Sequence, residues 1–288
     1  MSILLNRETR VLVQGITGRV GRVQAKWMLE YGTNIVAGVT PGKGGEEVEG
    51  IPVYDTVAEA VSKQGAEASV FFVPAGAVKG AALETIEAGI KLVVIITERV
   101  PVHDVMEIMA YAREQGVRLV GPNTPGIITP GEAKMGIMPG ITFTPGRIGI
   151  ISRSGTLSYE ISADLAAAGL GQSTVVGMGG DPVVFTSMPE LLELFERDLN
   201  TDLMVIIGEV GGAQEEKAAQ FIAQQMTKPV VAYIAGYNAP EGKRMGHAGA
   251  IIQGGMGTPQ SKITAFREAG VPVAEYPLEV AELAQRRL

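Results

Sequence analysis

Short runs rich in β-branched residues alternate with amphipathic helical stretches along most of this chain. In the first 121 residues, strands are expected at 10–14, 35–39, 68–72, 92–96 and 118–120. The helices between them are expected at 20–31, 57–64, 78–88 and 102–115. Continuous apolar strands separated by helices are typical of a parallel sheet that is covered on both faces. Residues 1–121 are therefore predicted to form a doubly wound α/β domain.

A proline-rich segment interrupts this alternation, and a second α/β series follows it. Residues 122–146 contain five prolines and several glycines, which predicts a connecting segment. Further strands are expected at 148–152, 173–176, 203–207, 230–234 and near 273. Further helices are expected at 156–168, 189–197, 213–225, 259–269 and 278–287. Residues 147–288 are therefore predicted to form a second, flavodoxin-like parallel domain.

The composition limits the classes of protein to which the chain can belong. Its 288 residues suffice for two domains. The formal net charge of −7 argues against nucleic acid as the main partner, because binding to a phosphate backbone needs a cationic surface. The absence of cysteine excludes disulfides, thiolate metal sites and a catalytic thiol. The start, MSILLNRETR, does not resemble a secretory signal, and no apolar stretch approaches 18 residues. A cytoplasmic protein without a membrane span is expected.

A glycine-rich loop, GITGRVG (15–21), leads from the first expected strand directly into a helix. Such a loop lets a phosphate approach the N–H groups at the helix N-terminus, and variants of it bind NAD(P), CoA and FAD. An NAD-binding fold would place Asp or Glu after the second strand, where this chain has TPGKGG (40–45). Lys43 suits an extra phosphate, as in the 3′-phosphate of CoA or the 2′-phosphate of NADP. A solvated surface lysine is the alternative.

Two further strand ends are expected at the same edge of the first sheet, FVPA (72–75) and IITE (95–98). Ligands of open α/β sheets lie beyond the carboxyl ends of the strands. Thr97 and Glu98 could therefore hydrogen-bond an adenine or a pantetheine amide, although ordinary strand-end turns explain them equally well.

The second domain contains a candidate anion site and a carboxylate. Ser154 follows a strand and opens a helix, so it is a natural N-cap at a helix end that can hold an anion. A serine nucleophile is less favoured, because the G-x-S-x-G pattern is absent. Glu209 lies among glycines at the end of another expected strand, where it could accept a hydrogen bond from an imidazole.

One of the two histidines lies in the glycine-containing run GKRMGHAGA (242–250). An imidazole such as that of His247 is mostly neutral at pH 7 and could attack phosphorus, and nearby cations would stabilise the added phosphate charge. If Glu209 accepts from one ring nitrogen of His247, the other is left as the nucleophile. A polar residue on a surface loop is the alternative.

Seven segments of the chain together resemble the family of alpha subunits of succinyl-CoA synthetases, the nucleoside-diphosphate-forming succinate–CoA ligases. They are QGITGRVG (14–21), TPGKGG (40–45), ITERVP (96–101), GPNTPGIITPGE (121–132), SRSGTLSYE (152–160), GEVGG (208–212) and GKRMGHAGAI (242–251). The resemblance covers essentially the whole chain. It implies a Rossmann-like CoA-binding domain followed by a flavodoxin-like ligase domain.

The resemblance also implies roles for residues of the first domain. The residues expected to bind CoA are Thr17, Gly18, Arg19 and Val20 at its phosphates, Lys43 nearby, and Ile96, Thr97 and Glu98 farther along.

In the second domain, the resemblance implies that His247 is phosphorylated transiently and that Glu209 steadies it. Ser154 and Gly155 head a helix whose N-terminus would hold the phosphate, and Tyr159 resembles a position associated with the carboxylate substrate.

The implied partner is an ATP-grasp beta subunit, in an αβ or α2β2 assembly, which would hold Mg²⁺ and ATP or GTP. No metal is expected on this chain, which has no Walker loop and no carboxylate cluster for magnesium. The implied reaction interconverts succinate, CoA and nucleoside triphosphate with succinyl-CoA, nucleoside diphosphate and phosphate, as in the citric acid cycle. A malate or citrate ligase subunit, an NADP-dependent oxidoreductase and a CoA-binding regulatory protein are the alternatives.

Overall fold

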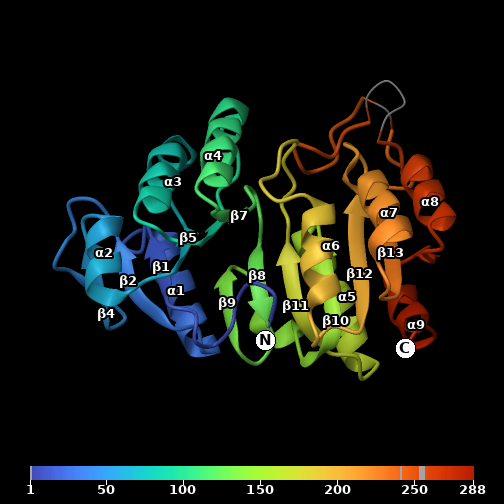
Figure 1. The fold of residues 1–288 in the computed structure, drawn as a ribbon, viewed down its shortest axis with the longest axis horizontal. Coiled ribbons are helices and arrows are strands. Elements are labelled where there is room, and N and C mark those ends of the chain that lie inside the picture. The colour runs from blue at the N-terminus through green and yellow to red at the C-terminus, as the bar shows by residue number, and fades with distance from the viewer. Residues whose placement is uncertain (1, 241, 253–256) are drawn as a thin grey trace. The chain divides into compact units, whose positions relative to one another are not determined.

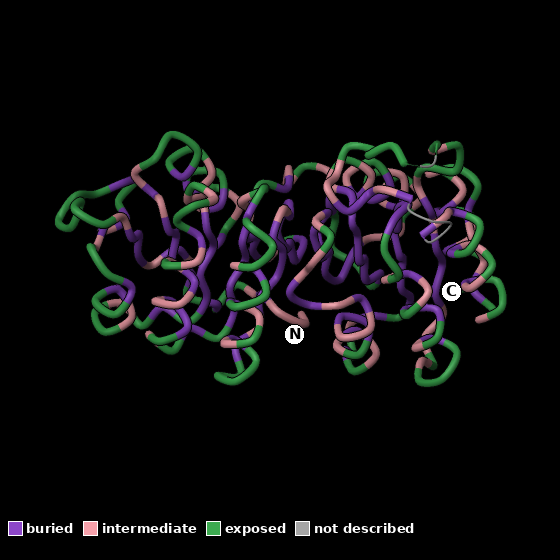
Figure 2. Tube along the Cα trace, turned by 90° about the horizontal axis from the view of Figure 1, so that it is seen from above, coloured by how far each residue is buried: buried purple, intermediate pink, exposed green. Residues whose placement is uncertain are grey.

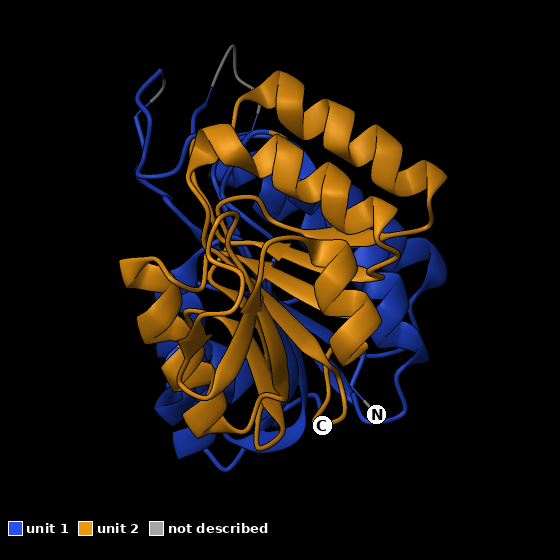
Figure 3. Ribbon diagram, turned by 90° about the vertical axis from the view of Figure 1, so that its left-hand side faces the viewer, with its two compact units in different colours: residues 1–3, 139–182, 186–288 blue, residues 4–138, 183–185 orange. Residues whose placement is uncertain are grey.

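The computed structural model describes residues 2–240, 242–252 and 257–288. The chain forms two compact units (Figure 3). We call residues 4–138 and 183–185 the N-terminal unit, and residues 1–3, 139–182 and 186–288 the C-terminal unit. In both units the strands are largely buried, and the helices expose one side to solvent (Figure 2).

The N-terminal unit is built on one twisted sheet (Figure 1). Its strands are β1 Val11–Gln14, β2 Ile35–Val39, β3 Glu47–Val48, β4 Ile51–Tyr54, β5 Ala68–Phe71, β6 Leu92–Ile95 and β7 Arg118–Val120. They follow the order β3-β4-β2-β1-β5-β6-β7, and only β3 is antiparallel to its neighbour. Without β3, the strands follow the Rossmann order 3-2-1-4-5-6. Strands β2 and β4 lie on one side of β1, and the later strands, from β5 onward, lie on its other side.

The helices of this unit are α1 Arg19–Tyr31, α2 Val57–Gln64, α3 Val78–Glu87 and α4 Val102–Glu114, with a 3₁₀ turn η1 at Ala75–Ala77. Helices α2, α3 and α4 pack side by side and share a core with the sheet, in which Phe71, Ile90 and Ile108 are fully buried. Helix α1 contacts β1, β2 and a hairpin that lies further along the chain.

That hairpin lies in the proline-rich segment 122–146. It consists of β8 Gly126–Thr129 and β9 Ala133–Gly136, which pair antiparallel. Thr129 donates a hydrogen bond to the carbonyl of Leu5, and the hydroxyl of Thr33 donates to the carbonyl of Lys134. The segment continues through a 3₁₀ turn η2, Gly140–Thr142, into the next strand.

The C-terminal unit contains a second parallel sheet. Its strands are β10 Pro145–Ser152, β11 Gln172–Gly177, β12 Leu203–Glu209, β13 Val230–Ala235 and β14 Val273–Ala274. Within this unit they follow the order β14-β13-β12-β10-β11, which in chain order is the flavodoxin-like 2-1-3-4-5 arrangement. The predicted fold class, a Rossmann-like domain followed by a flavodoxin-like one, is confirmed.

The helices of the C-terminal unit are α5 Gly155–Ala167, α6 Met188–Arg197, α7 Gln214–Gln225, α8 Pro259–Glu268 and α9 Glu279–Gln285. Helix α6 packs on α7 and α7 on α8, whereas α5 packs on α9 (Figure 1). The sequence sets several helix starts: Ser187 and Glu190 form a capping box at α6, and Thr258 caps α8. No helix in the described parts of the chain has both the length and the apolar character needed to cross a membrane.

Candidate active site

In the second sheet, the ends of two neighbouring strands carry polar side chains that lie close together. Strands β10 and β12 are neighbours, and the connections that leave them run in opposite directions along the sheet; open α/β sheets bind ligands at the carboxyl ends of such strands. Arg153 and Ser154 follow β10, and Glu209 is the last residue of β12. The side chains of these three residues are almost completely buried. The fold therefore places a cation, a hydroxyl and a carboxylate at one point.

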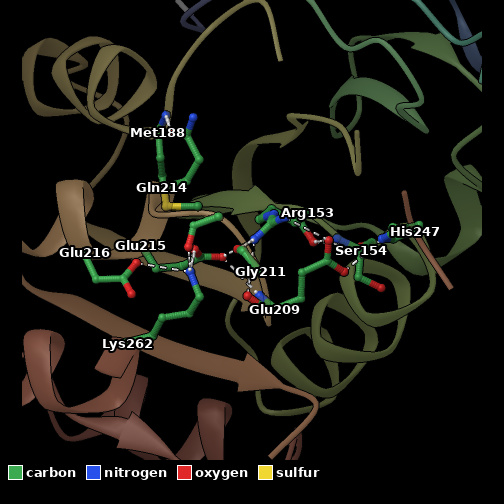
Figure 4. Close-up of polar contacts among 12 residues, drawn as sticks. Arg153, Ser154, Met188, Glu209, Gly211, Gln214, Glu215, Glu216, His247 and Lys262 are labelled. Carbon is green, nitrogen blue, oxygen red and sulfur yellow. Dashed lines mark hydrogen bonds and ion pairs between the residues drawn. The ribbon is translucent and has the colours of Figure 1, made fainter. Parts of the chain in front are cut away.

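His247 reaches this point from the loop between β13 and α8, whose residues 242–252 we call the histidine loop. Its Nδ1 lies 2.8 Å from Oε2 of Glu209 (Figure 4). A carboxylate can only accept, so Nδ1–H donates, and in the neutral ring the lone pair is on Nε2. The imidazole side chain is 32% exposed, whereas that of Glu209 is 8% exposed. The pair thus combines an accessible ring with a buried, fixed acceptor.

The histidine loop rests against backbone that lacks side chains. The amide of Gly249 donates to the carbonyl of Gly180, at 3.0 Å. A Cβ at Gly180 would lie 2.5 Å from Cγ of His247, and a Cβ at Gly211 would lie 2.1 Å from the carbonyl oxygen of Gly249. Glycine at 180 and 211 is therefore required for the loop to approach the strand ends.

The electrostatic surroundings raise the pKa of His247 above its usual value. The hydrogen bond to Glu209 is the largest cause, and partial burial opposes it by disfavouring the imidazolium. The charge of Glu209 and that of Asp181 act in the same direction as the hydrogen bond, and the charge of Arg153 acts against it. The ring is consequently a stronger base than an imidazole in water.

Glu209 is in turn held by Arg153. Nη2 of Arg153 lies 3.2 Å from Oε1 of Glu209, in an ion pair that lacks hydrogen-bond alignment, and Nη1 donates to the carbonyl oxygens of Glu209 and Gly211 at 3.2 Å and 2.9 Å. Burial alone would lower the pKa of Arg153, but the carboxylates of Glu215 and Glu209 raise it above its ordinary value. Arg153 is therefore a permanent buried cation behind the histidine–carboxylate pair.

The remaining candidates of this unit lie on α5. Ser154 is the N-cap, and its Oγ accepts from the amide of Leu157 at 3.4 Å. Gly155 is the first helical residue, and α5 has no acidic residue in its first turn, so its N-terminus can attract an anion. Tyr159 is half-buried, and its ring meets that of Phe143 edge-on with centroids 6.1 Å apart. Burial raises the pKa of Tyr159, which therefore keeps its proton at neutral pH.

In the N-terminal unit, the glycine loop has the geometry of a phosphate-binding turn. Gly15 adopts φ 74°, and a Cβ at Gly21 would lie 2.1 Å from the carbonyl oxygen of Gly15, so the helix starts tightly against the strand end. Gly18 is the N-cap of α1 and offers no side-chain cap, and the first turn contains no acidic residue. Gly18, Arg19 and Val20 are exposed, and Thr17 is half-buried. The backbone N–H groups there can meet an anion.

The other candidates of this unit lie on neighbouring loops. Thr97 donates from Oγ1 to the carbonyl of Val73 at 2.7 Å, which joins the loops after β5 and β6. Ile96 is half-buried and Glu98 is exposed, with Oε1 3.7 Å from Nε of Arg99. Lys43, after β2, is exposed and pairs with Glu46 at 2.9 Å. A ligand phosphate would have to compete with Glu46 for this ammonium.

Four residues with evident structural roles at this site were not assigned one from the sequence: Arg153, Gly180, Glu215 and Lys262. The position of Arg153 directly after a strand was a usable signal. Gly180 gave no signal, because its importance depends on a ring 67 positions away in the chain.

Comparison with known proteins assigns a family to each unit. A CoA-binding domain family matches residues 6–99, and a CoA-ligase family matches residues 151–272. The chain therefore contains a CoA-binding domain and a CoA-ligase domain. This decides between CoA and NADP, which the glycine loop and Lys43 left open.

Individual relatives narrow the class further. The chain is 56% identical over 283 residues to succinate–CoA ligase [ADP-forming] subunit alpha 2 of Archaeoglobus fulgidus, covering 98% of each chain. It is 54% identical over 290 residues to the corresponding alpha subunit of Aquifex aeolicus, covering 100% of this chain and 95% of the relative. The chain belongs to the family of succinate–CoA ligase alpha subunits.

A solved structure shares the architecture. ATP citrate lyase from Methanothrix soehngenii, solved in complex with citrate and coenzyme A, matches with a TM-score of 0.89 at 25% identity over 99% of this chain. This chain spans about half (51%) of the length of that protein.

Proposed function

We propose that this chain is the alpha subunit of an ADP-forming succinate–CoA ligase and that His247 carries the phosphoryl group. The observation that supports this most directly is the 2.8 Å contact between Nδ1 of His247 and the buried carboxylate of Glu209. That contact fixes the tautomer with the lone pair on Nε2, on a ring that remains accessible.

This arrangement supports a phosphoryl transfer through His247. Nε2 attacks the phosphorus of the donor, so that a P–N bond forms while the P–O bond to the leaving nucleoside diphosphate breaks. The imidazole is then cationic, and Glu209 stabilises that charge. Transfer to a succinate oxygen breaks the P–N bond and yields succinyl phosphate. The CoA thiol then attacks the acyl carbon: a C–S bond forms, the C–O bond to phosphate breaks, and the thiol proton leaves together with the phosphate. Ser154 and Gly155, at the N-terminus of α5, are the groups we expect to hold the phosphoryl oxygens.

CoA would bind to the N-terminal unit, at the residues expected from the sequence: Thr17, Gly18, Arg19, Val20, Lys43, Ile96, Thr97 and Glu98. Tyr159 would contact the carboxylate substrate. Succinate is the acid that the named relatives support.

The reaction would require a beta subunit, in an αβ or α2β2 assembly, and the name "alpha subunit" of the relatives implies such a partner. We expect the beta subunit to contribute an ATP-grasp fold, the nucleotide and Mg²⁺. We place the enzyme in the cytoplasm.

The direct test is to phosphorylate the chain. The full-length protein is mixed with its beta subunit, Mg²⁺ and γ-³²P-labelled ATP or GTP. We expect label that is labile to acid and stable to base, and its loss to background in His247→Asn, because we propose that Nε2 of His247 forms the P–N bond.

His103→Asn is the matched control, because His103 is the other histidine of the chain and lies exposed on α4. This variant should keep the label. Label that survives His247→Asn would overturn the proposal.

The raised pKa of His247 gives a second prediction. Below that pKa, Nε2 carries a proton and has no lone pair. We therefore expect single-turnover phosphorylation to slow as the pH falls, with a midpoint above the ordinary imidazole value of about 6.5. In Glu209→Gln the midpoint should move down, because a neutral amide stabilises the imidazolium less well. A wild-type midpoint at or below 6.5 would contradict this assignment.

The raised pKa of His247 also makes the stability of the fold depend on pH. This dependence runs opposite to that of the phosphorylation rate. Because the folded-state pKa of His247 is raised, the residue stabilises the protein fully below its unfolded pKa. That contribution is lost as the pH rises through the folded pKa. The most active protonation state is thus not the most stable one.

A further inference from the structure

A buried row of charges of alternating sign extends behind the histidine–carboxylate pair (Figure 4). After Arg153 it continues to Glu215 in the first turn of α7, and then to Lys262 on α8. Glu215 and Lys262 are both completely buried. Oε1 of Glu215 accepts from Nη1 of Arg153 at 2.9 Å, and its Oε2 pairs with Nζ of Lys262. Nζ of Lys262 also lies 3.1 Å from Oε2 of Glu216, which is partly exposed.

The stability of the fold does not account for this row. Taking charges out of water costs free energy that their mutual attraction barely repays, and apolar residues of similar volume often serve as well or better. Burial would raise the pKa of Glu215, but Arg153 and Lys262 lower it below its ordinary range, so the carboxyl is ionised at neutral pH. The burial of the ionised pair Glu215–Lys262 therefore needs another explanation, which follows from the contacts of Glu215.

The amide, the carbonyl and Oε2 of Glu209 are hydrogen-bonded, whereas its Oε1 is held only by the ion pair with Arg153. The amide N–H of Glu209 donates to Oε1 of Glu215 at 3.1 Å. The carbonyl and Oε1 of Glu209 face Arg153, which Glu215 orients. Only Oε2 of Glu209 points to His247. The rotamer of Glu209, and with it the direction of Oε2, is therefore set from behind.

We propose that Glu215 and Lys262 are positioning residues, which act through Arg153 to hold the Glu209 carboxylate against Nδ1 of His247. Lys262 fixes one oxygen of Glu215, so that the other stays available to Arg153 and to the amide of Glu209. Neither residue touches the reacting atoms. The catalytic part of this inference rests on the proposed phosphorylation of His247, whereas the positioning itself does not.

Lys262→Met separates positioning from simple electrostatics, because the two predict opposite signs. Removal of a positive charge would by itself raise the pKa of His247. Loss of positioning instead releases the Oε2 contact of Glu209, and the pKa of His247 then falls toward that of a solvated imidazole. The other charged groups that act on the ring, Arg153 and Asp181, are unchanged in this variant.

The pKa can be measured on the full chain without its partner. Histidine ring ¹H–¹³C NMR signals are followed against pH, and the chain contains only His103 and His247, so a spectrum of His103→Asn assigns both. We expect Lys262→Met to lower the pKa of His247 and to leave that of His103 unchanged. An unchanged or raised pKa of His247 would overturn the proposal.

Two further variants control for general damage. Lys134→Met removes the other buried lysine of the described chain, which bonds the carbonyl of Met138 in the N-terminal unit, and should leave the pKa of His247 unchanged. Glu215→Gln combined with Lys262→Met removes both buried charges but keeps an oxygen for Arg153 and for the Glu209 amide. This double variant should recover much of the His247 pKa even if Lys262→Met alone folds poorly; no recovery in the folded double variant would contradict positioning.

The kinetic consequence is tested with the beta subunit, Mg²⁺ and ATP. Phosphorylation in Lys262→Met should slow by roughly tenfold or more, because misplaced catalytic groups lose rate steeply, while CoA binding stays unchanged. If the wild type is not phosphorylated, the proposed function is wrong. The positioning role of Glu215 and Lys262 is then still tested by the NMR measurement of the His247 pKa. If wild type is phosphorylated and Lys262→Met is equally fast, the positioning proposal fails alone.

Discussion

Gly180→Ala is expected to slow phosphorylation of His247 by about 100-fold, although it adds a single methyl group. The new Cβ would lie 2.5 Å from Cγ, 2.7 Å from Nδ1 and 2.9 Å from Cδ2 of the ring, so the ring has to move. Since the imidazole is partly exposed, we expect it to move toward solvent and to lose its contact with Oε2 of Glu209. The pKa of His247 should then fall. Single-turnover labelling with the beta subunit and NMR titration of the ring measure the two effects.

The effect on folding should be small by comparison. Gly180 does not have a positive φ, so alanine meets no backbone strain there, and the displaced ring is not part of a core. Gly80→Ala is the matched control: Gly80 also lacks a positive φ, and its Cβ would meet nothing within 4 Å. Since Gly80 lies inside α3, alanine there should stabilise the protein by about 0.5–1 kcal/mol without changing phosphorylation. Normal labelling in Gly180→Ala would show that the ring works in another position.

Local sequence signals were enough to predict most elements of the fold. The helix expected at 57–64 coincides with α2, because Thr56 caps its start and Gly65, at φ 60°, ends it. The apolar runs of β2 and β7 likewise have the expected bounds. In these elements the burial pattern and the end signals agree, so no long-range information was needed.

Two hairpins were not predicted, for different reasons. In the first, β3 has two residues and Pro52 lies within β4, and proline argues against a strand in a single sequence. In the second, glycines suggested a connecting segment. A Cβ at Gly126 would lie 2.0 Å from the carbonyl oxygen of Met135, so this glycine allows two strands to approach closely. Close backbone approach and a flexible connection require the same residue type.

From the sequence, the candidate site could be predicted where it lies at strand ends and in the histidine loop. Glu209 and Ser154 could be placed at the carboxyl edge of one sheet, because parallel strands all end there. The buried charges of Glu215 and Lys262 could not be placed near them from the sequence. Glu215 is 62 positions from Arg153, and Lys262 is 47 positions from Glu215. An acid in a first helical turn and a lysine on a helix are ordinarily solvated, and these two are buried by tertiary contacts, among them the packing of α7 on α8.

Arg153→Met is expected to destabilise the protein by about 3–5 kcal/mol at neutral pH, because it removes the cation that pairs with the buried carboxylates of both Glu209 and Glu215. Arg153 is 5% exposed, and methionine fills part of its volume without restoring any of its hydrogen bonds. Urea denaturation followed by circular dichroism measures the change. Arg147→Met is the matched control, since Arg147 pairs with Asp202 in solvent and its loss should cost far less.

The pH dependence of this variant distinguishes a lost ion pair from a lost packing contact. In the wild type the pKa of Glu215 is lowered, so its contribution to stability is present above the unfolded pKa and disappears as the pH falls through the folded pKa. Without Arg153, only Lys262 opposes the effect of burial on Glu215, so the pKa of Glu215 rises and its carboxyl takes up a proton at a higher pH than in the wild type. The difference in unfolding free energy between wild type and Arg153→Met should therefore shrink as the pH is lowered from 7 toward about 5. If the difference is the same at both values, the cost comes from packing, and the buried charges do not hold the site together.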